Sequence, residues 1–138
     1  MKPIIRNKKP VPYQRKYKMQ WWTFDASLSK LKTQINPYKD QIKNIYGVPR
    51  GGLVIAVALS NYYNIPLITN QKKIDERTLV CDDLSDSGAT FLNLLQKYHV
   101  TFTACLIVKK DTTNFFPTFF PSTIDGNKWI VFPWEGSR

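Results

Sequence analysis

The chain has 138 residues, of which 43% are hydrophobic, so it can bury the core of one domain and is not a disordered polymer. No apolar stretch reaches the length of a membrane span, because the most apolar one covers only residues 51–59. The net charge is +10 and much of it lies within residues 2–18, which favours a solvated surface or attraction of anionic substrates over nucleic-acid binding, for which no motif is present.

The first residues and the two cysteines bear on where the protein is found. Residues 1–10 lack the apolar core of a signal peptide, so we expect a cytosolic, cytoplasmic protein. Cys81 and Cys105 fall in predicted core strands, and their spacing matches no metal-binding motif. We therefore expect two free, buried thiols.

After a basic arm over residues 1–18, the first predicted element is a helix. It begins at Thr23, the expected N-cap, and ends at Asn36-Pro37. Its core face recurs at helical spacing and consists of Phe24, Leu28, Leu31 and Ile35. A short strand over residues 44–48 follows, then a turn, then a helix of about a dozen residues that closes near Asn64.

The second half of the chain continues the alternation. Residues 65–69 and 78–82 are predicted strands, residues 88–98 a helix, and residues 101–108 a fourth strand. The helix is expected to face inward through Phe91, Leu92, Leu95 and Tyr98. This order of strands and helices predicts an α/β fold, a mostly parallel twisted sheet with flanking helices.

The C-terminal segment has a different composition. Residues 110–138 are rich in Phe and Trp and are interrupted by prolines, so we do not expect a helix packed on the sheet. We expect this segment to fold as an aromatic hood over one end of the sheet. Because the sequence shows no internal repeat and no linker, residues 1–138 are predicted to form one domain.

Residues 78–90 carry the most informative pattern. An apolar strand runs into two adjacent carboxylates, Asp82 and Asp83, and a small-residue loop over residues 86–90 leads into a helix. Ligands of α/β sheets bind at the carboxyl ends of strands, and a helix start offers N–H groups to a phosphate. Such a site favours a sugar phosphate with a divalent cation. A solvated strand end with a capping Asp86 is the weaker alternative, given three carboxylates in so short a segment.

A second loop of this kind follows the strand at residues 44–48. Arg50-Gly51-Gly52 can turn sharply, present N–H groups to an anion and add a positive charge, although alone it indicates only a tight turn. Because both loops follow parallel strands, we expect them at one edge of the sheet. His99, the single histidine, lies at a predicted helix end, so any proton transfer is expected from a carboxylate, lysine or tyrosine.

Three segments resemble the type I phosphoribosyltransferase family. Residues 79–90 resemble its signature for 5-phosphoribosyl-1-pyrophosphate (PRPP), and residues 46–52 resemble its pyrophosphate loop. Residues 129–135, Trp-Ile-Val-Phe-Pro-Trp-Glu, are similar to the C-terminus of bacterial xanthine-guanine and hypoxanthine-guanine (purine) members. The similarity covers residues 19–135, almost the whole chain.

The resemblance implies roles in a PRPP site. Asp82 and Asp83 would bind the ribose hydroxyls, partly through Mg²⁺, which would be held by these two residues with substrate and water. Arg50 and Gly51 would hold the pyrophosphate, through a strained or cis peptide. Asp86 would stand near the base nitrogen as a general acid or base. The 5-phosphate would lie in a cradle formed by Asp86, Ser87, Gly88, Ala89 and Thr90.

The resemblance also implies a purine-binding set. Lys109 would donate to the 6-oxo group, Trp129 would stack on the purine, and Ile130 would offer backbone contacts to its edge. Taken singly, Lys109 is a surface charge at a strand end and Trp129 a core aromatic; their joint placement favours the purine site. Val131 stands where some members carry an acidic residue toward the 2-substituent, so hypoxanthine, guanine and xanthine all remain candidates.

The implied activity is transfer of the phosphoribosyl group of PRPP to an oxopurine, with release of pyrophosphate and with Mg²⁺ as cofactor. Family members form homodimers or homotetramers, and we expect neither a membrane nor a nucleic acid as partner. Family members also carry a long mobile loop between the second and third strands. Here only residues 70–77 connect them, which is too short for a lid. The alternative is therefore a PRPP- or nucleotide-binding regulator without turnover, whose basic arm could bind RNA.

Overall fold

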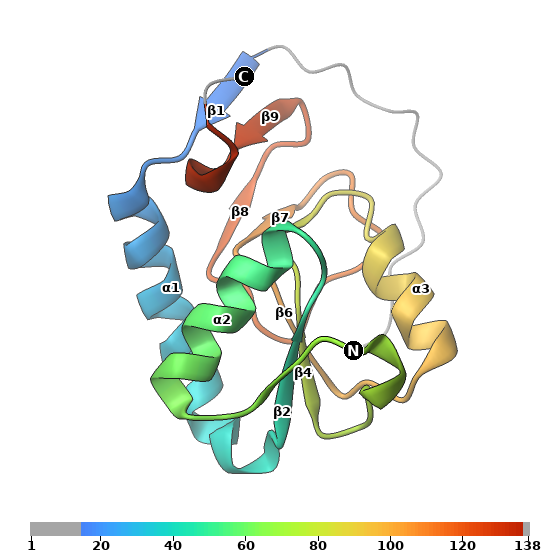
Figure 1. Cartoon of the computed structure of the whole chain (residues 1–138). Helices are drawn as coiled ribbons and strands as arrows, with labels where there is room; N and C mark the ends of the chain where they lie inside the picture. Colours follow the sequence, from blue (N-terminus) through green and yellow to red (C-terminus); the bar gives the residue numbers. More distant parts are fainter. Residues whose placement is uncertain (1–14, 137–138) are drawn as a thin grey trace.

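The computed structural model describes residues 15–136 and places helices on both faces of a parallel sheet (Figure 1). The helices are α1 (Trp21–Ile35), α2 (Gly51–Tyr63) and α3 (Ala89–Lys97), joined by the short 3₁₀ helices η1 (Asn36–Gln41), η2 (Gln71–Lys73) and η3 (Pro133–Glu135). In Figure 1, α1 and α2 lie on one side of the strands and α3 on the other. The chain has the predicted α/β architecture.

The strands form three parallel sheets. The central sheet has the order β3-β2-β4-β6, made of β3 (Leu67–Ile68), β2 (Asn44–Gly47), β4 (Thr78–Cys81) and β6 (Phe102–Ala104). A second sheet has the order β5-β7-β8, made of β5 (Leu84–Ser85), β7 (Ile107–Lys109) and β8 (Ser122–Ile124). The third pairs β1 (Arg15–Lys18) with β9 (Lys128–Val131). Parallel pairing places the carboxyl ends of neighbouring strands at one edge.

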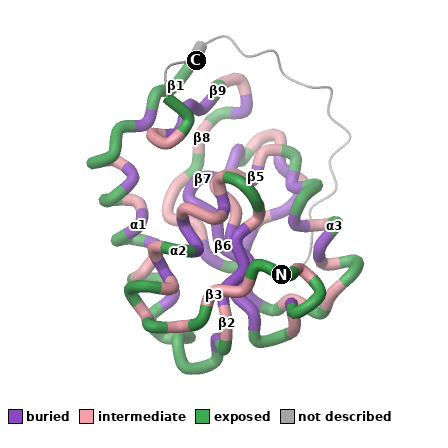
Figure 2. The backbone as a smooth tube through the Cα atoms, in the orientation of Figure 1, coloured by how far each residue is buried: buried purple, intermediate pink, exposed green. Residues whose placement is uncertain are grey.

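Two hydrophobic clusters pack on the two faces of the sheet. The first holds α1 and α2 against the strands, and it contains the whole predicted face of α1: Phe24, Leu28, Leu31 and Ile35. The second holds α3 through Phe91 and Leu94, which pack with Val80 and Val108. Figure 2 shows that the buried backbone concentrates in the central strands. The core therefore follows the helical and strand periodicity of the sequence.

The predicted face of α3 is only partly correct. Phe91 is buried as expected, but Leu94, which was not among the predicted residues, is the second buried position of the helix. Leu92, Leu95 and Tyr98 are partly buried and pack on the same cluster. The helix therefore rests on the sheet along the line from Phe91 to Leu94, and the other three side chains flank that line.

The predicted N-cap of α1 is wrong. The helix begins two residues before Thr23, at Trp21, and its N-cap is Gln20 in an extended conformation. The preceding residue, Met19, is buried, and its N–H donates to the Val131 carbonyl at 2.9 Å. Because this contact fixes the chain beside β9, the helix starts immediately after it, and tertiary packing overrides the capping preference of Thr23.

The predicted fourth strand, residues 101–108, is two strands. β6 pairs with β4, whereas β7 pairs with β5 and β8, and Cys105 and Leu106 lie between them. The Cys105 N–H donates to the Phe119 carbonyl at 3.1 Å and the Leu106 N–H to the Asp83 carbonyl at 3.1 Å. The backbone thus changes partners at this point, and a continuous apolar run gives no sign of such a change in pairing.

The C-terminal segment forms strands as well as a cover. Part of it extends the second sheet as β8, and part of it pairs with β1 as β9. Residues 15–18 of the basic arm form β1, and residues 1–14 lie outside the described residues. Cys81 and Cys105 are free and buried, as predicted. None of the helices within residues 15–136 is long and apolar enough to span a bilayer.

Candidate active site

Two loops meet at the carboxyl edge of the central sheet. β2 and β4 pair in parallel with Gly47 opposite Cys81, so the loops that follow these strands start side by side. The Val48 N–H donates to the Cys81 carbonyl at 2.9 Å and continues the pairing into the loops. A cis peptide bond joins Pro49 and Arg50 in the first loop. This is the arrangement that the sequence predicted for the Arg-Gly-Gly turn and the acidic pair.

Gly51 is where the first loop comes closest to the second. A Cβ atom at Gly51 would overlap the carboxylate of Asp83. Any other residue would displace either α2, which begins at Gly51, or the Asp83 side chain. The glycine therefore allows a backbone segment with a nearby positive charge, from Arg50, to lie directly against the acidic pair.

The acidic pair is partly buried. The Asp83 N–H donates to Oδ1 of Asp82 at 2.8 Å, and this hydrogen bond holds the Asp82 carboxylate beside the peptide bond that joins the two residues. Burial raises the pKa of Asp82 well above its usual range, and repulsion from Asp83 adds to the effect. Burial also raises the pKa of Asp83, and the carboxylate of Glu135 adds to it. Two carboxylates held this close favour a bound cation or a proton between them.

The small-residue loop leads into α3 as predicted. Gly88 is the N-cap of the helix with φ of 84°, and a Cβ there would lie 2.8 Å from the Phe115 backbone N. The Ala89 N–H donates to Oγ of Ser87 at 3.2 Å. Ser87, Ala89 and Thr90 are exposed at the helix start. Glycine meets both demands of this position, the left-handed backbone and the close approach of Phe115.

Hydrogen bonds to a neighbouring segment, residues 113–115, hold this loop in place. Ser85 Oγ donates to the Phe115 carbonyl at 2.8 Å and lies 3.0 Å from Oγ1 of Thr113. The backbone N–H of Asn114 donates to the Ser87 carbonyl at 2.9 Å. These bonds join the loop to residues 113–115 and fix the position of the helix start.

Lys109 is the buried cation of the site. Its side chain is 1% exposed, and Nζ lies 3.2 Å from Oδ2 of Asp86, whose side chain is 43% exposed. The sequence predicted Lys109 for the purine and Asp86 for the phosphate or the base nitrogen, but did not predict that they form an ion pair. The pair joins the end of β7 to the loop that precedes α3.

Two cavities bring the predicted residues together. One, of about 180 Å³, is lined by Asp83, Leu84, Asp86, Lys109, Trp129, Ile130, Phe132 and Glu135. The other, of about 420 Å³, is lined by Arg50, Gly51, Val54, Asp83, Trp134 and Glu135. Asp83 and Glu135 line both, so the cavities adjoin. Asp82 and residues 87–90 line neither of them; Asp82 directly precedes Asp83, and residues 87–90 form the end of the second loop and the start of α3.

The sequence interpretation missed Glu135. This residue ends η3, and its Oε1 accepts the Phe132 N–H at 2.9 Å. Proline at the start of a short helix with an acidic residue two positions later is a recognisable helix-start pattern. The ring of Phe132 stacks on Trp134 with centroids 4.9 Å apart, which fixes the turn that carries Glu135 into the site.

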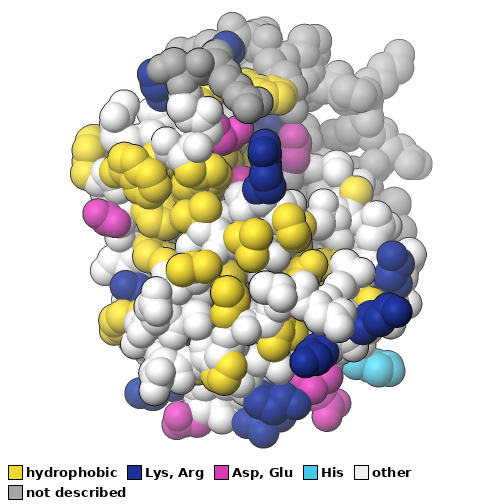
Figure 3. Space-filling model, viewed as in Figure 1, with side chains coloured by type: hydrophobic (Ala, Val, Ile, Leu, Met, Phe, Trp, Pro, Cys, Tyr) yellow, Lys and Arg dark blue, Asp and Glu magenta, His cyan; other side chains and the backbone are white. Residues whose placement is uncertain are grey.

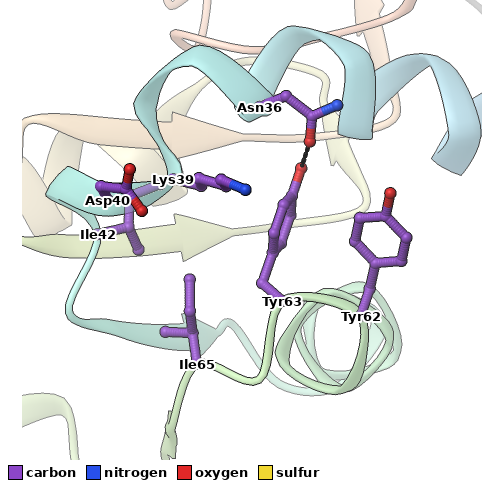
Figure 4. A pocket seen from close by; sticks show the side chains of 7 residues that line it. All are labelled: Asn36, Lys39, Asp40, Ile42, Tyr62, Tyr63 and Ile65. Carbon is purple, nitrogen blue, oxygen red and sulfur yellow. Dashed lines mark hydrogen bonds between the residues drawn. The ribbon is translucent and has the colours of Figure 1, made fainter.

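A larger cavity lies away from these loops. It has a volume of about 840 Å³ and is lined by residues of η1, the end of α2 and Ile65 (Figure 4). Figure 4 shows Tyr63 pointing from α2 toward η1, where its hydroxyl donates to Oδ1 of Asn36 at 2.6 Å. These residues precede β2 and β3, so the cavity lies at the amino ends of the strands. It contains none of the predicted site residues.

The connection over residues 70–77 is short and closely bonded. Asn70 accepts the Lys72 N–H at 3.0 Å and caps η2. Asp75 accepts the Arg77 N–H at 2.9 Å and pairs with Lys43 at 2.7 Å. The Tyr98 hydroxyl lies 3.4 Å from Oε1 of Gln71. The connection is thus held against the end of α3 and the start of β2, in agreement with the prediction that it is not a lid.

Solved structures resemble this chain over nearly its whole length. The purine phosphoribosyltransferase from Pyrococcus horikoshii Ot3 is 29% identical, with a TM-score of 0.75, over 89% of this chain and 96% of that one. The Helicobacter pylori xanthine-guanine-hypoxanthine phosphoribosyltransferase is 19% identical, with a TM-score of 0.76, over 90% and 94%. A hypoxanthine-guanine phosphoribosyltransferase from Schistosoma mansoni, in complex with IMP, is 18% identical, with a TM-score of 0.61, over 91% and 82%.

No protein-family model matches the sequence. The two solved structures of lower identity show that this chain shares their fold. The Pyrococcus protein shares the fold and also 29% of the aligned residues. The two loops that contain residues 46–52 and 79–90, with the Arg-Gly-Gly turn and the acidic pair, lie side by side at the carboxyl edge of the central sheet. The chain has the fold of the type I phosphoribosyltransferases and is similar to a purine member of that family over nearly its whole length.

Proposed function

We propose that the protein is a purine phosphoribosyltransferase that transfers the phosphoribosyl group of PRPP to an oxopurine and releases pyrophosphate. One observation carries the proposal: Asp83 lines both of the adjoining cavities. We call the smaller of the two, which Lys109 and Trp129 also line, the slot, and the other, which Arg50 and Gly51 also line, the groove. A substrate with a base at one end and a diphosphate at the other would span these adjoining cavities, with its ribose at the carboxylate between them.

The slot suits a neutral oxopurine. The Trp129 side chain is 47% exposed and offers a flat aromatic face, while Lys109 offers a cation for a carbonyl oxygen. Lys109 is withdrawn from water, so its hydrogen bond to a 6-oxo group would be stronger than one made at the surface. Ile130 would contribute backbone contacts at the edge of the base.

The acidic loop suits the ribose and its phosphate. Asp82 and Asp83 would bind the ribose hydroxyls, and the start of α3 would hold the 5-phosphate with its backbone N–H groups. Asp86, held by Lys109, would exchange a proton with the base nitrogen. These residues catalyse by orienting the two substrates and by excluding water, since displacement of pyrophosphate needs no covalent intermediate on the protein.

The donor set fits Mg²⁺. Asp82 and Asp83 are partly buried carboxylates with raised pKa values, and a divalent cation would lower these pKa values again. Among residues 15–136, no group of three or more His, Cys, Asp and Glu side chains could hold a metal alone. Mg²⁺ is commonly bound by one or two carboxylates together with substrate phosphates, and such an ion would neutralise the charge on pyrophosphate.

A second candidate function is PRPP or nucleotide binding without turnover. The observation that favours it is the short connection over residues 70–77, which is bonded away from the site. The oligomeric state, for which we expect a homodimer or homotetramer, stays a prediction.

Both candidates are tested by incubating the protein with PRPP, Mg²⁺ and, in turn, hypoxanthine, guanine and xanthine. We expect a nucleotide product from at least one base. PRPP binding with no product from any base would favour the regulator instead.

The site itself is tested by the double variant Asp82→Asn, Asp83→Asn. We expect PRPP binding to fall by on the order of 100-fold, because charge-assisted contacts to the substrate and its cation are lost. The matched control is Asp25→Asn, Asp40→Asn, which removes the same charge from exposed positions. Unchanged binding in the first variant, with the fold intact by circular dichroism, would mean that the acidic pair is a solvated strand end.

A further inference from the structure

The proposed stacking surface of the slot is an indole that the core holds only in part. Trp129 is 47% exposed, whereas Ile130 and Val131, which follow it in β9, are buried. A tryptophan that stacks on a base must keep one orientation, because the contact between two flat rings shrinks when either ring turns. Side chains beside Trp129 on the same face of β9 therefore bear on how tightly a base is bound.

The strand β1 places a lysine beside this indole. It pairs in parallel with β9 so that Lys16 lies opposite Trp129. Paired residues of neighbouring strands point to the same face of a sheet, and the two backbones lie about 4.8 Å apart. The Lys16 side chain therefore leaves the sheet next to the indole. Figure 3 shows Lys and Arg side chains at the top of the molecule, where Figure 1 draws β1.

Lys16 lies outside the slot itself. Its side chain is exposed, and it is not among the described residues that line the slot. The slot contains a cation of its own, Lys109, which suits the 6-oxo group of the base. An effect of Lys16 on base binding would therefore pass through Trp129.

A lysine side chain and a tryptophan ring are chemically suited to pack together. Lysine lays its methylene groups along apolar surfaces while its ammonium group stays in water. An ammonium group over the face of an aromatic ring is attracted to the electron density of that face, most strongly when the ring is Trp. Lys16 against one face of the indole would limit rotation of the ring and leave the opposite face for the base.

We propose that Lys16 is a positioning residue for the base: it packs against Trp129 and holds the indole in the orientation that stacks on the purine. This inference rests on the proposed function and deepens it, since it extends base binding from β9 to β1. Lys18 offers a matched comparison, because it is also exposed and shares a face of β1 with Lys16 but lies opposite Val131. Val131 is not among the described residues that line the slot.

The test uses two ligands that differ only in the base. Inosine monophosphate (IMP) carries a purine on ribose 5-phosphate, so calorimetric titration with each ligand gives the contribution of the base to affinity without any turnover. In Lys16→Gln we expect the affinity for IMP to fall about 3- to 5-fold, the size of one exposed cation–π contact, and the affinity for ribose 5-phosphate to change less than about 1.5-fold. Lys18→Gln should change neither affinity.

Two further variants test whether the effect passes through Trp129. Lys16→Arg should keep the affinity for IMP, because a guanidinium group also stacks on an indole. In a Trp129→Leu background, Lys16→Gln should cause no further loss, whereas independent contributions would add. All of these variants keep the backbone pairing of β1 with β9, so an unchanged melting temperature serves as the check on folding.

The outcomes separate this inference from the proposed function. Unchanged IMP affinity in Lys16→Gln, or an undiminished loss in the Trp129→Leu background, would overturn the inference and leave the proposed function standing. An equal loss for both ligands would do the same, because Lys16 would then attract the phosphate. If the wild type bound IMP no more tightly than ribose 5-phosphate, the slot would not take a base, and both would be overturned.

Discussion

A buried lysine in a small protein requires compensation, and Lys109 has a partner that itself reaches solvent. Taking an ammonium group out of water costs several kcal/mol unless hydrogen bonds and an opposite charge restore what is lost. Asp86 supplies the charge at 3.2 Å. An ion pair of this kind rarely improves stability over apolar side chains, which agrees with the ligand-binding role proposed for Lys109.

Lys109→Met should separate these two contributions. We expect the affinity for the oxopurine to fall about 10-fold or more, and the free energy of unfolding to change by less than about 1 kcal/mol or to rise, because Met fills the site without a charge. Base affinity would be measured by titration in the presence of PRPP, and stability by urea unfolding.

The matched control for this prediction is Lys110→Met. Lys110 is adjacent in sequence, but its side chain is 56% exposed and pairs with Asp125 on the surface. It should leave base affinity unchanged. A loss of stability of more than about 3 kcal/mol in Lys109→Met, without an effect on base affinity, would make the ion pair structural.

At this scale the sequence identified residues better than it identified contacts. Asp83, Lys109 and Trp129 were named from motifs, and they line one cavity. The Lys109–Asp86 pair was not predictable, because it joins the end of β7 to the loop after β5, and the separation of these two segments depends on how β5 and β7 pair. Glu135 was missed because its pattern with Pro133 indicates the start of a helix but not that this helix places the carboxylate near Asp83.

Among the elements, the 70–77 connection depends on one carboxylate. Asp75 accepts the side-chain bond of Lys43 and the N–H of Arg77, and its own N–H donates to Oγ1 of Thr78. The hydrogen bond from Lys43 lowers the pKa of Asp75, and the one from Arg77 adds to the effect. The ionised form is therefore the form that holds the connection in place.

Asp75→Asn should loosen this connection in a pH-dependent way. Because the folded-state pKa of Asp75 is lowered, its contribution to stability is present at neutral pH and is lost as the pH falls below about 4. We expect the melting temperature of the variant to lie slightly below that of the wild type at pH 7, and the two to converge as the pH falls through the lowered folded-state pKa of Asp75. Glu76→Gln, at the adjacent exposed position, should leave the melting temperature unchanged at both neutral and acidic pH.

The elements themselves were predicted as well as local patterns allow. The buried face of α1 was correct to the residue, because four apolar positions at helical spacing leave one solution. The start of α1 and the break between β6 and β7 were not, because both are set by hydrogen bonds to distant segments, at Val131 and Phe119. Sequence periodicity carries no information on such partners.

Across the whole molecule, each of the two hydrophobic clusters of the core contains one buried thiol. Cys81 packs in the cluster with α1 and α2, and Cys105 in the cluster with α3. Both are fully buried, and burial raises the pKa of each thiol, so neither ionises near neutral pH.

A thiol reagent such as DTNB should therefore modify neither cysteine in the native protein at pH 8. In denaturant both should react, and the slow native reaction should follow the rate or equilibrium of unfolding. Mass spectrometry of the two labelled peptides would show whether both faces open together. Rapid labelling of one thiol under native conditions would contradict the packing described for that face.

The parallel pairing of β1 with β9 has a consequence for how the protein is made. It joins the first described strand to the last, across the greatest sequence separation available in the described chain. A contact of this kind carries a large loop-closure cost and forms late in folding. During synthesis, all four strands of the central sheet are made before Trp129. The wall that carries Trp129 is thus completed only after residues 128–131 have been synthesised, and products truncated before residue 128 would retain the acidic loop without the proposed slot for the base.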